Sequence, residues 1–186
     1  SGLRRRGQAV TVPPPAAAPA GPAPQEDFSD RVSLTFTIGV YAAINAIRDA
    51  YLIIDAPDCA HLKTGFLQGN HDWFGTLTSV TGVHRVANTD LHPWKMVAAR
   101  DDAIEAFLRQ MAGFDGAGAV LITSLPMATI TGLDYDRLTR KVTAETGKPV
   151  VSVPGKSLSG DWLDGDADTL KALARAVDLE GAEPRP

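Results

Sequence analysis

The stretch Tyr51-Leu52-Ile53-Ile54-Asp55-Ala56-Pro57-Asp58-Cys59-Ala60-His61 decides the fold that we expect for this chain. Its first four residues favour β structure and run into an Asp-Ala-Pro turn, which predicts a buried strand over residues 51–54. Cys59, the only cysteine in 186 residues, follows the turn directly. In a parallel α/β sheet, ligands bind just past the carboxyl ends of the strands. The sequence therefore places Cys59 at a candidate site.

Two interpretations of Cys59 are open at this level. The thiolate of a cysteine binds metal ions and attacks electrophiles, so a cysteine beside a strand end fits a functional site. A lone cysteine is also a small apolar residue that packs well in a core. The local sequence does not decide between the two.

Composition predicts a single soluble α/β domain. Hydrophobic residues make up 44% of the chain and aromatic residues 6%, which suits α/β structure better than a β-sandwich. The 18 basic and 22 acidic residues give a net charge of −4, so we expect no nucleic-acid partner. No apolar run approaches the roughly 20 residues of a membrane span, and one cysteine agrees with a reducing, cytoplasmic location.

Both ends of the chain are expected to be tails. Residues 1–30 contain Arg4-Arg5-Arg6 and then an Ala/Pro-rich stretch with almost nothing to bury, which predicts disorder. Prolines interrupt the apolar region that a signal peptide needs after its arginines. Residues 180–186 have the same character, so we expect one folded domain over residues 31–179.

Helical and strand patterns alternate between the tails. Asp134 and Gly147 are expected to begin and end one helix, and Asp166 or Asp168 to cap the last one. Continuous apolar strands that alternate with helices are typical of a Rossmann-like parallel sheet covered by helices on both faces. Helices are predicted over residues 39–50, 60–68, 101–112, 134–146 and 167–179, and strands over 51–54, 83–87, 119–123 and 148–153.

Three features look like catalytic motifs but are incomplete. Gly155-Lys156-Ser157 follows a strand, yet Val150 stands where a phosphate-binding loop has its first glycine. Gly69-Asn70-His71-Asp72 resembles a metallophosphatase box, but no buried strand precedes it. The four histidines are ten, thirteen and eight residues apart, which fits no pair of metal ligands on a helix. A small hydrolase that uses Asp and His near residue 71 is therefore the least favoured hypothesis.

The order of the elements resembles the first domain of the nitrogenase component 1 family. That family includes the subunits of nitrogenase's larger protein and of the light-independent protochlorophyllide and chlorophyllide reductases. The glycine-led helix that starts Gly39-Val40-Tyr41-Ala42-Ala43-Ile44 precedes the strand, and Ala56-Pro57-Asp58-Cys59 matches the family's Gly-Pro-x-Gly-Cys turn. Residues 127–134 match a later family segment. The resemblance covers roughly residues 35 to 177.

The resemblance implies an iron-sulfur cluster held between subunits, with Cys59 as a metal ligand. Family subunits often carry three cluster cysteines, and here Thr35 and Pro126 stand in two of those places. A four-iron, four-sulfur cluster takes four ligands, mostly thiolates, so this chain would need a partner chain to complete the set. Asp58 and His61 are the candidate non-thiolate groups. Aromatic residues that could shield the site are Trp73, Phe74 and Trp94.

The implied function is electron relay in a nitrogenase-like oxidoreductase. An ATP-dependent iron-sulfur reductase protein would supply the electrons, and a component 1-like partner subunit, identical or different, would share the cluster. Complete family subunits have three such domains, so this chain would not be catalytically complete alone. The alternative is a non-catalytic interaction domain that keeps the scaffold and binds no cluster.

Overall fold

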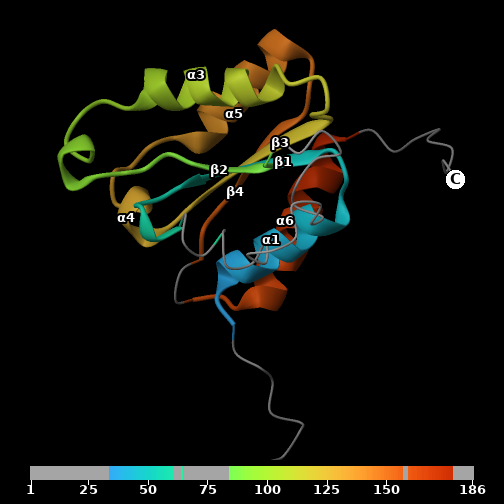
Figure 1. Ribbon diagram of the computed structural model, residues 1–186, viewed down its shortest axis with the longest axis horizontal. Helices are drawn as coiled ribbons and strands as arrows, with labels where there is room; N and C mark the ends of the chain where they lie inside the picture. Colours follow the sequence, from blue (N-terminus) through green and yellow to red (C-terminus); the bar gives the residue numbers. More distant parts are fainter. Residues whose placement is uncertain (1–33, 61–63, 65–83, 157–158, 178–186) are drawn as a thin grey trace, which may run out of the picture. The chain divides into compact units, whose positions relative to one another are not determined.

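The structure is a computed structural model that describes residues 34–60, 64, 84–156 and 159–177 (Figure 1). The two predicted tails and most of the expected helix over residues 60–68 lie outside these ranges. The described helices and strands follow one another as α1 (Phe36–Ala46), β1 (Ala50–Asp55), β2 (Val86–Asn88), η1 (Pro93–Lys95, a 3-10 helix), α3 (Asp101–Ala112), β3 (Ala119–Ser124), α4 (Pro126–Thr129), α5 (Tyr135–Thr146), β4 (Val150–Val153) and α6 (Trp162–Ala176).

The four strands form one parallel sheet in the order β2-β1-β3-β4. Leu52 of the central strand β1 lies opposite Val86 of β2 and Leu121 of β3. Helices α3 and α5 lie on one side of the sheet, and α1 and α6 lie on the other (Figure 1). The predicted parallel sheet with both faces covered is therefore confirmed.

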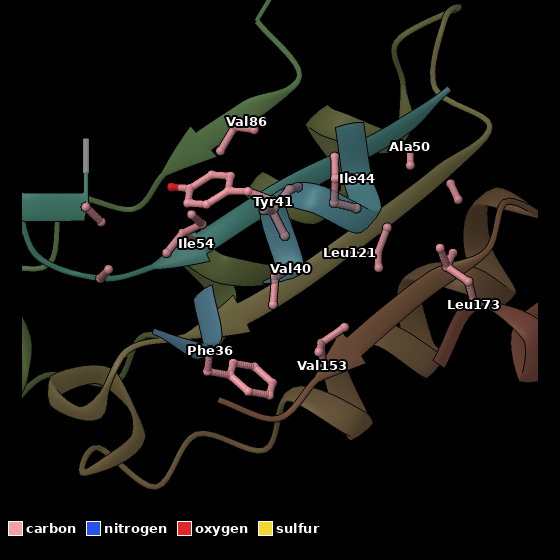
Figure 2. Close-up of a cluster of buried hydrophobic side chains, with 14 residues drawn as sticks. Phe36, Val40, Tyr41, Ile44, Ala50, Ile54, Val86, Leu121, Val153 and Leu173 are labelled. Atoms are coloured by element: carbon pink, nitrogen blue, oxygen red, sulfur yellow. The ribbon is translucent and has the colours of Figure 1, made fainter. Parts of the chain in front are cut away.

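Successive residues of β1 supply two separate cores, because side chains alternate across a strand. Leu52 and Ile54 face α1 and α6, whereas Tyr51 and Ile53 face α3 and α5. Figure 2 shows the first core, with Ile44 of α1 beside β1. Every residue of β1 is buried, and each fully buried aliphatic side chain stabilises the fold by about 1.5–3 kcal/mol.

The helix limits follow local capping signals. Asp134 caps α5 by accepting a hydrogen bond from the backbone N–H of Arg137 at 2.9 Å, and Gly147 ends that helix with a left-handed φ of 69°, as predicted. The prediction for α6 was wrong at its start. Asp161 forms a capping box with Asp164, so the helix begins at Trp162, five residues earlier than expected.

Other boundaries also differ from the predictions. Helix α1 begins at Phe36 rather than at residue 39, and β2 contains three residues instead of five. The short helices η1 and α4 were not predicted, and each has a proline in its first turn, Pro93 and Pro126. Both are shorter than the window over which helical periodicity can be recognised.

The residue before β2 is a buried arginine. Arg85 is 1% exposed and turns its guanidinium towards the end of α1. Its Nη1 donates to the carbonyl oxygens of Ile44 at 3.1 Å, Ile47 at 2.6 Å and Ala50 at 2.9 Å. Burial lowers the pKa of Arg85, and the bonded carbonyls together with the negative helix end compensate the buried charge.

Two glycines allow α1 and α6 to cross at close range. A Cβ atom at Gly39 would lie 1.7 Å from the carbonyl oxygen of Trp162, and one at Gly165 would lie 2.0 Å from that of Phe36. The obstructing atoms belong to helix backbone, so they cannot move aside as a side chain could. Each helix therefore needs glycine where it meets the other.

Within the described ranges, no helix has both the length and the apolar character that crossing a membrane requires.

We expect Gly39→Ala to lower the free energy of unfolding by about 2 kcal/mol or more, because the new methyl group overpacks the crossing of α1 and α6. Urea unfolding followed by circular dichroism measures this loss. Gly113→Ala is the matched control, since Gly113 has a φ of −72° that alanine adopts freely. Equal stability of the two variants would contradict the close-contact explanation.

Candidate functional site

The topology of the sheet indicates a candidate site at the carboxyl ends of β1 and β3. From β1 the chain goes to β2 on one side, whereas from β3 it goes to β4 on the other side. Ligands of doubly wound sheets bind at such a switch point, because the connections leave a crevice there. Asp55 and Ser124, the last residues of the two strands, lie opposite each other in register.

Asp55 is the centre of a buried polar network at this switch point. Its carboxylate is fully buried, and Oδ1 accepts hydrogen bonds from Thr89 Oγ1 at 2.6 Å and from Arg100 Nη2. Oδ2 accepts from the hydroxyl of Tyr135. The side chain of Arg100 is 9% exposed, so the two opposite charges compensate each other inside the protein. Asp55 thus joins the end of β1 to the segments that follow β2 and that begin α3 and α5.

Burial and the neighbouring carboxylate both act on Tyr135. Burial raises the pKa of its hydroxyl most, and the hydrogen bond to Asp55 raises it further. The hydroxyl therefore stays protonated and donates to Asp55 at all physiological pH values. Beside it, Ser124 Oγ and Thr129 Oγ1 lie 3.1 Å apart, which continues the polar edge to α4.

The turn after β1 is fixed by hydrogen bonds from both neighbouring loops. The backbone N–H of Ala56 donates to Thr89 Oγ1 at 3.2 Å, and the carbonyl oxygen of Ala56 accepts from Leu91 N at 2.8 Å. On the other side, Leu125 N donates to the carbonyl oxygen of Asp55 at 3.1 Å. The chain that leads to Cys59 is therefore anchored at Asp55 and Ala56.

Cys59 lies at the carboxyl edge, as the sequence predicted. It is exposed, makes no disulfide, and is part of a helical segment in which Ala60 N donates to the carbonyl oxygen of Pro57 at 3.0 Å. Thr35 directly precedes α1, which begins near the carboxyl edge and leads to the start of β1. Pro126 is the first residue of α4, which follows β3. The three positions that correspond to cluster cysteines in the resemblance thus lie along one edge of the sheet.

The described residues do not hold a four-iron cluster by themselves. Among them, no three His, Cys, Asp or Glu side chains gather as a metal site. Cys59 is the single thiol of the chain and Asp58 beside it is exposed, so this edge offers one thiolate and one carboxylate. The donor set fits a cluster only if another chain completes the ligation.

The other sequence-predicted residues are spread over the molecule or lie outside the described ranges. Trp94 is 67% exposed, and its contact is with His92, on which it stacks with ring centroids 4.4 Å apart. His92 Nε2 lies 2.9 Å from Asp90 Oδ2, and His84 is exposed. Residues outside the described ranges are His61, His71, Asp72, Trp73 and Phe74.

The Gly155-Lys156 pair has a structural explanation. A Cβ atom at Gly155 would lie 2.0 Å from the carbonyl oxygen of Ser124, so glycine permits close approach of the ends of β4 and β3. Lys156 Nζ lies 2.7 Å from Asp168 of α6, and this bond raises the pKa of Lys156. Its ammonium group is engaged in an ion pair rather than directed at a phosphate site.

Sequence analysis missed Thr89, Arg100 and Tyr135 as members of the site. One signal was present: Asp55 ends a completely apolar strand, and a buried carboxylate needs a cation and hydrogen-bond donors. The residues that supply these groups could not be identified from sequence spacing, because they lie 34, 45 and 80 residues after Asp55.

Comparisons with known proteins identify a family and a shared fold. Residues 36–186 match the family described as Nitrogenase component 1 type Oxidoreductase. The fold superposes on "Nitrogenase Cp1 at pH 6.5" with a TM-score of 0.62 and 12% identity over 86% of this chain, and on "Nitrogenase Cp1 at pH 5" with 0.64 and 14% over 83%. This chain spans 35% and 32% of those two chains, about a third of their length. No curated protein sequence matches it.

We expect Asp55→Asn to destabilise the protein by about 3 kcal/mol, because it leaves the buried charge of Arg100 without a counter-charge. Chemical denaturation measures this loss. Asp101→Asn is the control, since the Asp101–Arg137 pair has side chains that are 43% and 49% exposed and should contribute less than about 1 kcal/mol. Similar losses in the two variants would mean that the buried pair is no more important than a surface pair.

We also predict that stability decreases above about pH 10 in a way that depends on Tyr135, whose ordinary pKa is 10.0. The raised pKa means that, above pH 10, the unfolded state loses a proton that the folded state retains, so folding is disfavoured as pH rises. Tyr135→Phe should flatten this alkaline decrease. Free energies of unfolding measured at pH 8, 10 and 11 test this prediction, because these values lie on both sides of the ordinary pKa of tyrosine, about 10. An unchanged slope in the variant would refute the assignment.

Proposed function

Because the chain belongs to the nitrogenase component 1 family, we propose that its domain over residues 31–179 is part of a nitrogenase-like reductase. In this proposal Cys59 is one ligand of an iron-sulfur cluster that is shared with a partner subunit. The observation that carries it is an exposed thiol just after a hydrogen-bonded turn, past the carboxyl end of β1 and at the switch point of the sheet.

Two features of the site support ligation across an interface. The thiol is exposed, so a second chain can reach it, whereas the backbone of Asp55 and Ala56 before it is held by hydrogen bonds with Thr89, Leu91 and Leu125. A ligand that is held in place before binding loses little conformational freedom when it binds. Asp55 and Arg100 contribute indirectly, because their buried pair fixes Thr89 and the start of α3.

The partner must supply most of the ligands. With one thiolate on this chain, a four-iron, four-sulfur cluster needs three further ligands, which a component 1-like partner would provide. The chemistry that a bound cluster supplies is electron transfer, and we propose an ATP-dependent iron-sulfur reductase protein as the electron donor, in the cytoplasm. The chain spans about a third of the matched structures, and the part that we propose for it is electron relay rather than substrate reduction.

The small number of metal-ligating side chains favours a second function. The described residues gather no three metal-ligating side chains, and Cys59 is the only thiol. A domain that keeps the scaffold and docks onto partner subunits without a cluster would have these properties. It needs a partner but no iron, which separates it from the first proposal.

We would test the cluster by measuring iron and acid-labile sulfide in protein purified without oxygen, alone and co-expressed with component 1-like subunits. We expect broad absorbance near about 400 nm, typical of thiolate-to-iron charge transfer, only in the co-expressed complex. Cys59→Ser should lower the iron content of that complex by at least about a quarter, since it removes one of four ligands.

Ala174→Ser is the matched control, because Ala174 is exposed on α6 near the opposite edge of the sheet. It should leave the iron content unchanged. A colourless, iron-free complex that still assembles would support the interaction domain instead, and equal iron in Cys59→Ser and Ala174→Ser would remove Cys59 from the ligand set.

A further inference from the structure

Strand β4 is an edge of the sheet, and its free side opens into a groove between α5 and α6. The groove has a volume of about 620 Å³, and Val150, Val151 and Ser152 of β4 line it. Val151 and Ser152 are half-buried, so this edge of the sheet is accessible from outside. An open strand edge presents unpaired backbone groups, to which a further extended segment can bind.

Threonines of α5 cover the first part of this edge. Thr143 Oγ1 accepts a hydrogen bond from the backbone N–H of Val150 at 3.0 Å and donates to the carbonyl oxygen of Val150 at 3.2 Å. Thr146 Oγ1 accepts from the backbone N–H of Lys148 at 3.3 Å. These hydroxyl groups take the place of a neighbouring strand, so residues 148 and 150 are not open to pairing with an added segment.

Ser152 is the open position of the edge. The carbonyl oxygen of Pro149 faces β3, where it accepts from Val120 N at 2.9 Å. Backbone groups of successive residues alternate between the two sides of a strand, so the N–H and C=O groups of Ser152 point away from β3, towards the groove. Neither group has a hydrogen bond among the described residues. Ser152 therefore presents one donor and one acceptor that an extended segment can satisfy.

The charges of the groove favour an acidic segment. Arg140 of α5 and Arg175 of α6 line its two walls, both are exposed, and neither is part of an ion pair within the described ranges. Asp136 is the one carboxylate in the described lining, and it shares the wall of Arg140, whose Nε donates to the carbonyl oxygen of Asp136 at 3.1 Å. Successive side chains of an extended segment point to opposite sides, so two adjacent acidic residues would reach one arginine each.

The walls of the groove also leave room for an added strand. Ala144 of α5 and Ala172 and Ala176 of α6 line them, and their side chains are short. Neighbouring strands lie about 4.8 Å apart, and short wall residues leave space on both sides of a strand at that distance from β4. Apolar residues of medium size, such as valine, therefore fit beside the acidic ones.

The handedness of the fold disfavours the chain's own continuation as the occupant. Helix α5 connects β3 to β4 on one face of the sheet, whereas α6 follows β4 on the other face (Figure 1). A parallel strand joined to β4 through α6 and lying beside it would have a connection of the opposite hand to β3-α5-β4, and about 98% of such connections are right-handed. We propose that the free edge of β4 binds an extended acidic segment of another protein, through the backbone of Ser152 and the guanidinium groups of Arg140 and Arg175.

Three blocked hexapeptides test the two kinds of contact. The probe is Thr-Val-Glu-Glu-Val-Thr, and the controls are Thr-Val-Gln-Gln-Val-Thr and the probe with its four central residues N-methylated. Titration into the full chain, followed by amide shifts in nuclear magnetic resonance spectra, gives each Kd. We expect the glutamine peptide to bind about fivefold more weakly, as the loss of two exposed ion pairs predicts. The N-methylated peptide should bind at least about tenfold more weakly, because it cannot donate to the carbonyl oxygen of Ser152.

Variants locate the site in the groove. Arg175→Gln should reduce the preference for glutamate over glutamine to about twofold, whereas Arg48→Gln, at an exposed arginine outside the groove, should leave it unchanged. Ser152→Pro should abolish binding, because proline has no N–H and its ring covers the open side of the strand. This variant should fold, since the N–H that it removes points away from the sheet, where edge strands tolerate proline.

Each outcome decides the proposal. Saturable shifts confined to β4, α5 and α6, which follow the expected order of the peptides and disappear in Ser152→Pro, support it. Equal binding of the glutamate and glutamine peptides, binding that N-methylation does not weaken, or no binding of the probe at millimolar concentrations would overturn it. If Ser152→Pro does not fold, the N-methylated peptide and Arg175→Gln decide instead.

Analytical ultracentrifugation of the free protein tests whether a second copy occupies the edge. We expect no dimer that depends on Ser152. A dimer that becomes monomeric in Ser152→Pro would assign the edge to self-association and overturn the binding of a different protein. These measurements do not depend on iron, so the proposed function of Cys59 stands or falls separately.

Discussion

The buried pair of Asp55 and Arg100 is the interaction on which the carboxyl edge of the sheet depends. A carboxylate at the end of a fully buried strand would be strongly destabilising alone, and Arg100, Thr89 and Tyr135 compensate it from three later segments. These segments must therefore converge on β1 for the chain to fold. Desolvation of both charges offsets much of their attraction, so we infer that the pair contributes specificity of arrangement more than net stability.

The helices pack differently on the two faces of the sheet. On one face, α1 and α6 approach so closely that Gly39 and Gly165 must lack side chains, and Arg85 compensates the end of α1. On the other face, α3 and α5 pack through larger side chains such as Leu108 and Leu138. The glycine crossing fixes where α1 begins, and α1 begins at the carboxyl edge.

The network around Asp55 also serves the candidate site. Thr89 accepts from the backbone of Ala56, which fixes the turn before Cys59, and donates to Asp55. Asp55 also accepts a hydrogen bond from Nη2 of Arg100, which holds the residue before α3. The exposed thiol is thus preceded by a turn whose hydrogen-bond partners are themselves fixed, as a preorganised site requires.

The sequence by itself determined the elements with strong local signals. The apolar runs gave β1, β3 and β4 to within two residues, and Asp134 and Gly147 marked the limits of α5, because caps and periodicity are local properties. It also placed Cys59 after a strand. The early start of α6 at Trp162 also follows a local signal, the capping box of Asp161 and Asp164, which our prediction missed. Tertiary structure alone decided the partners of Asp55, since they are far along the chain. Contacts between distant residues depend on how the elements pack, which no local pattern encodes.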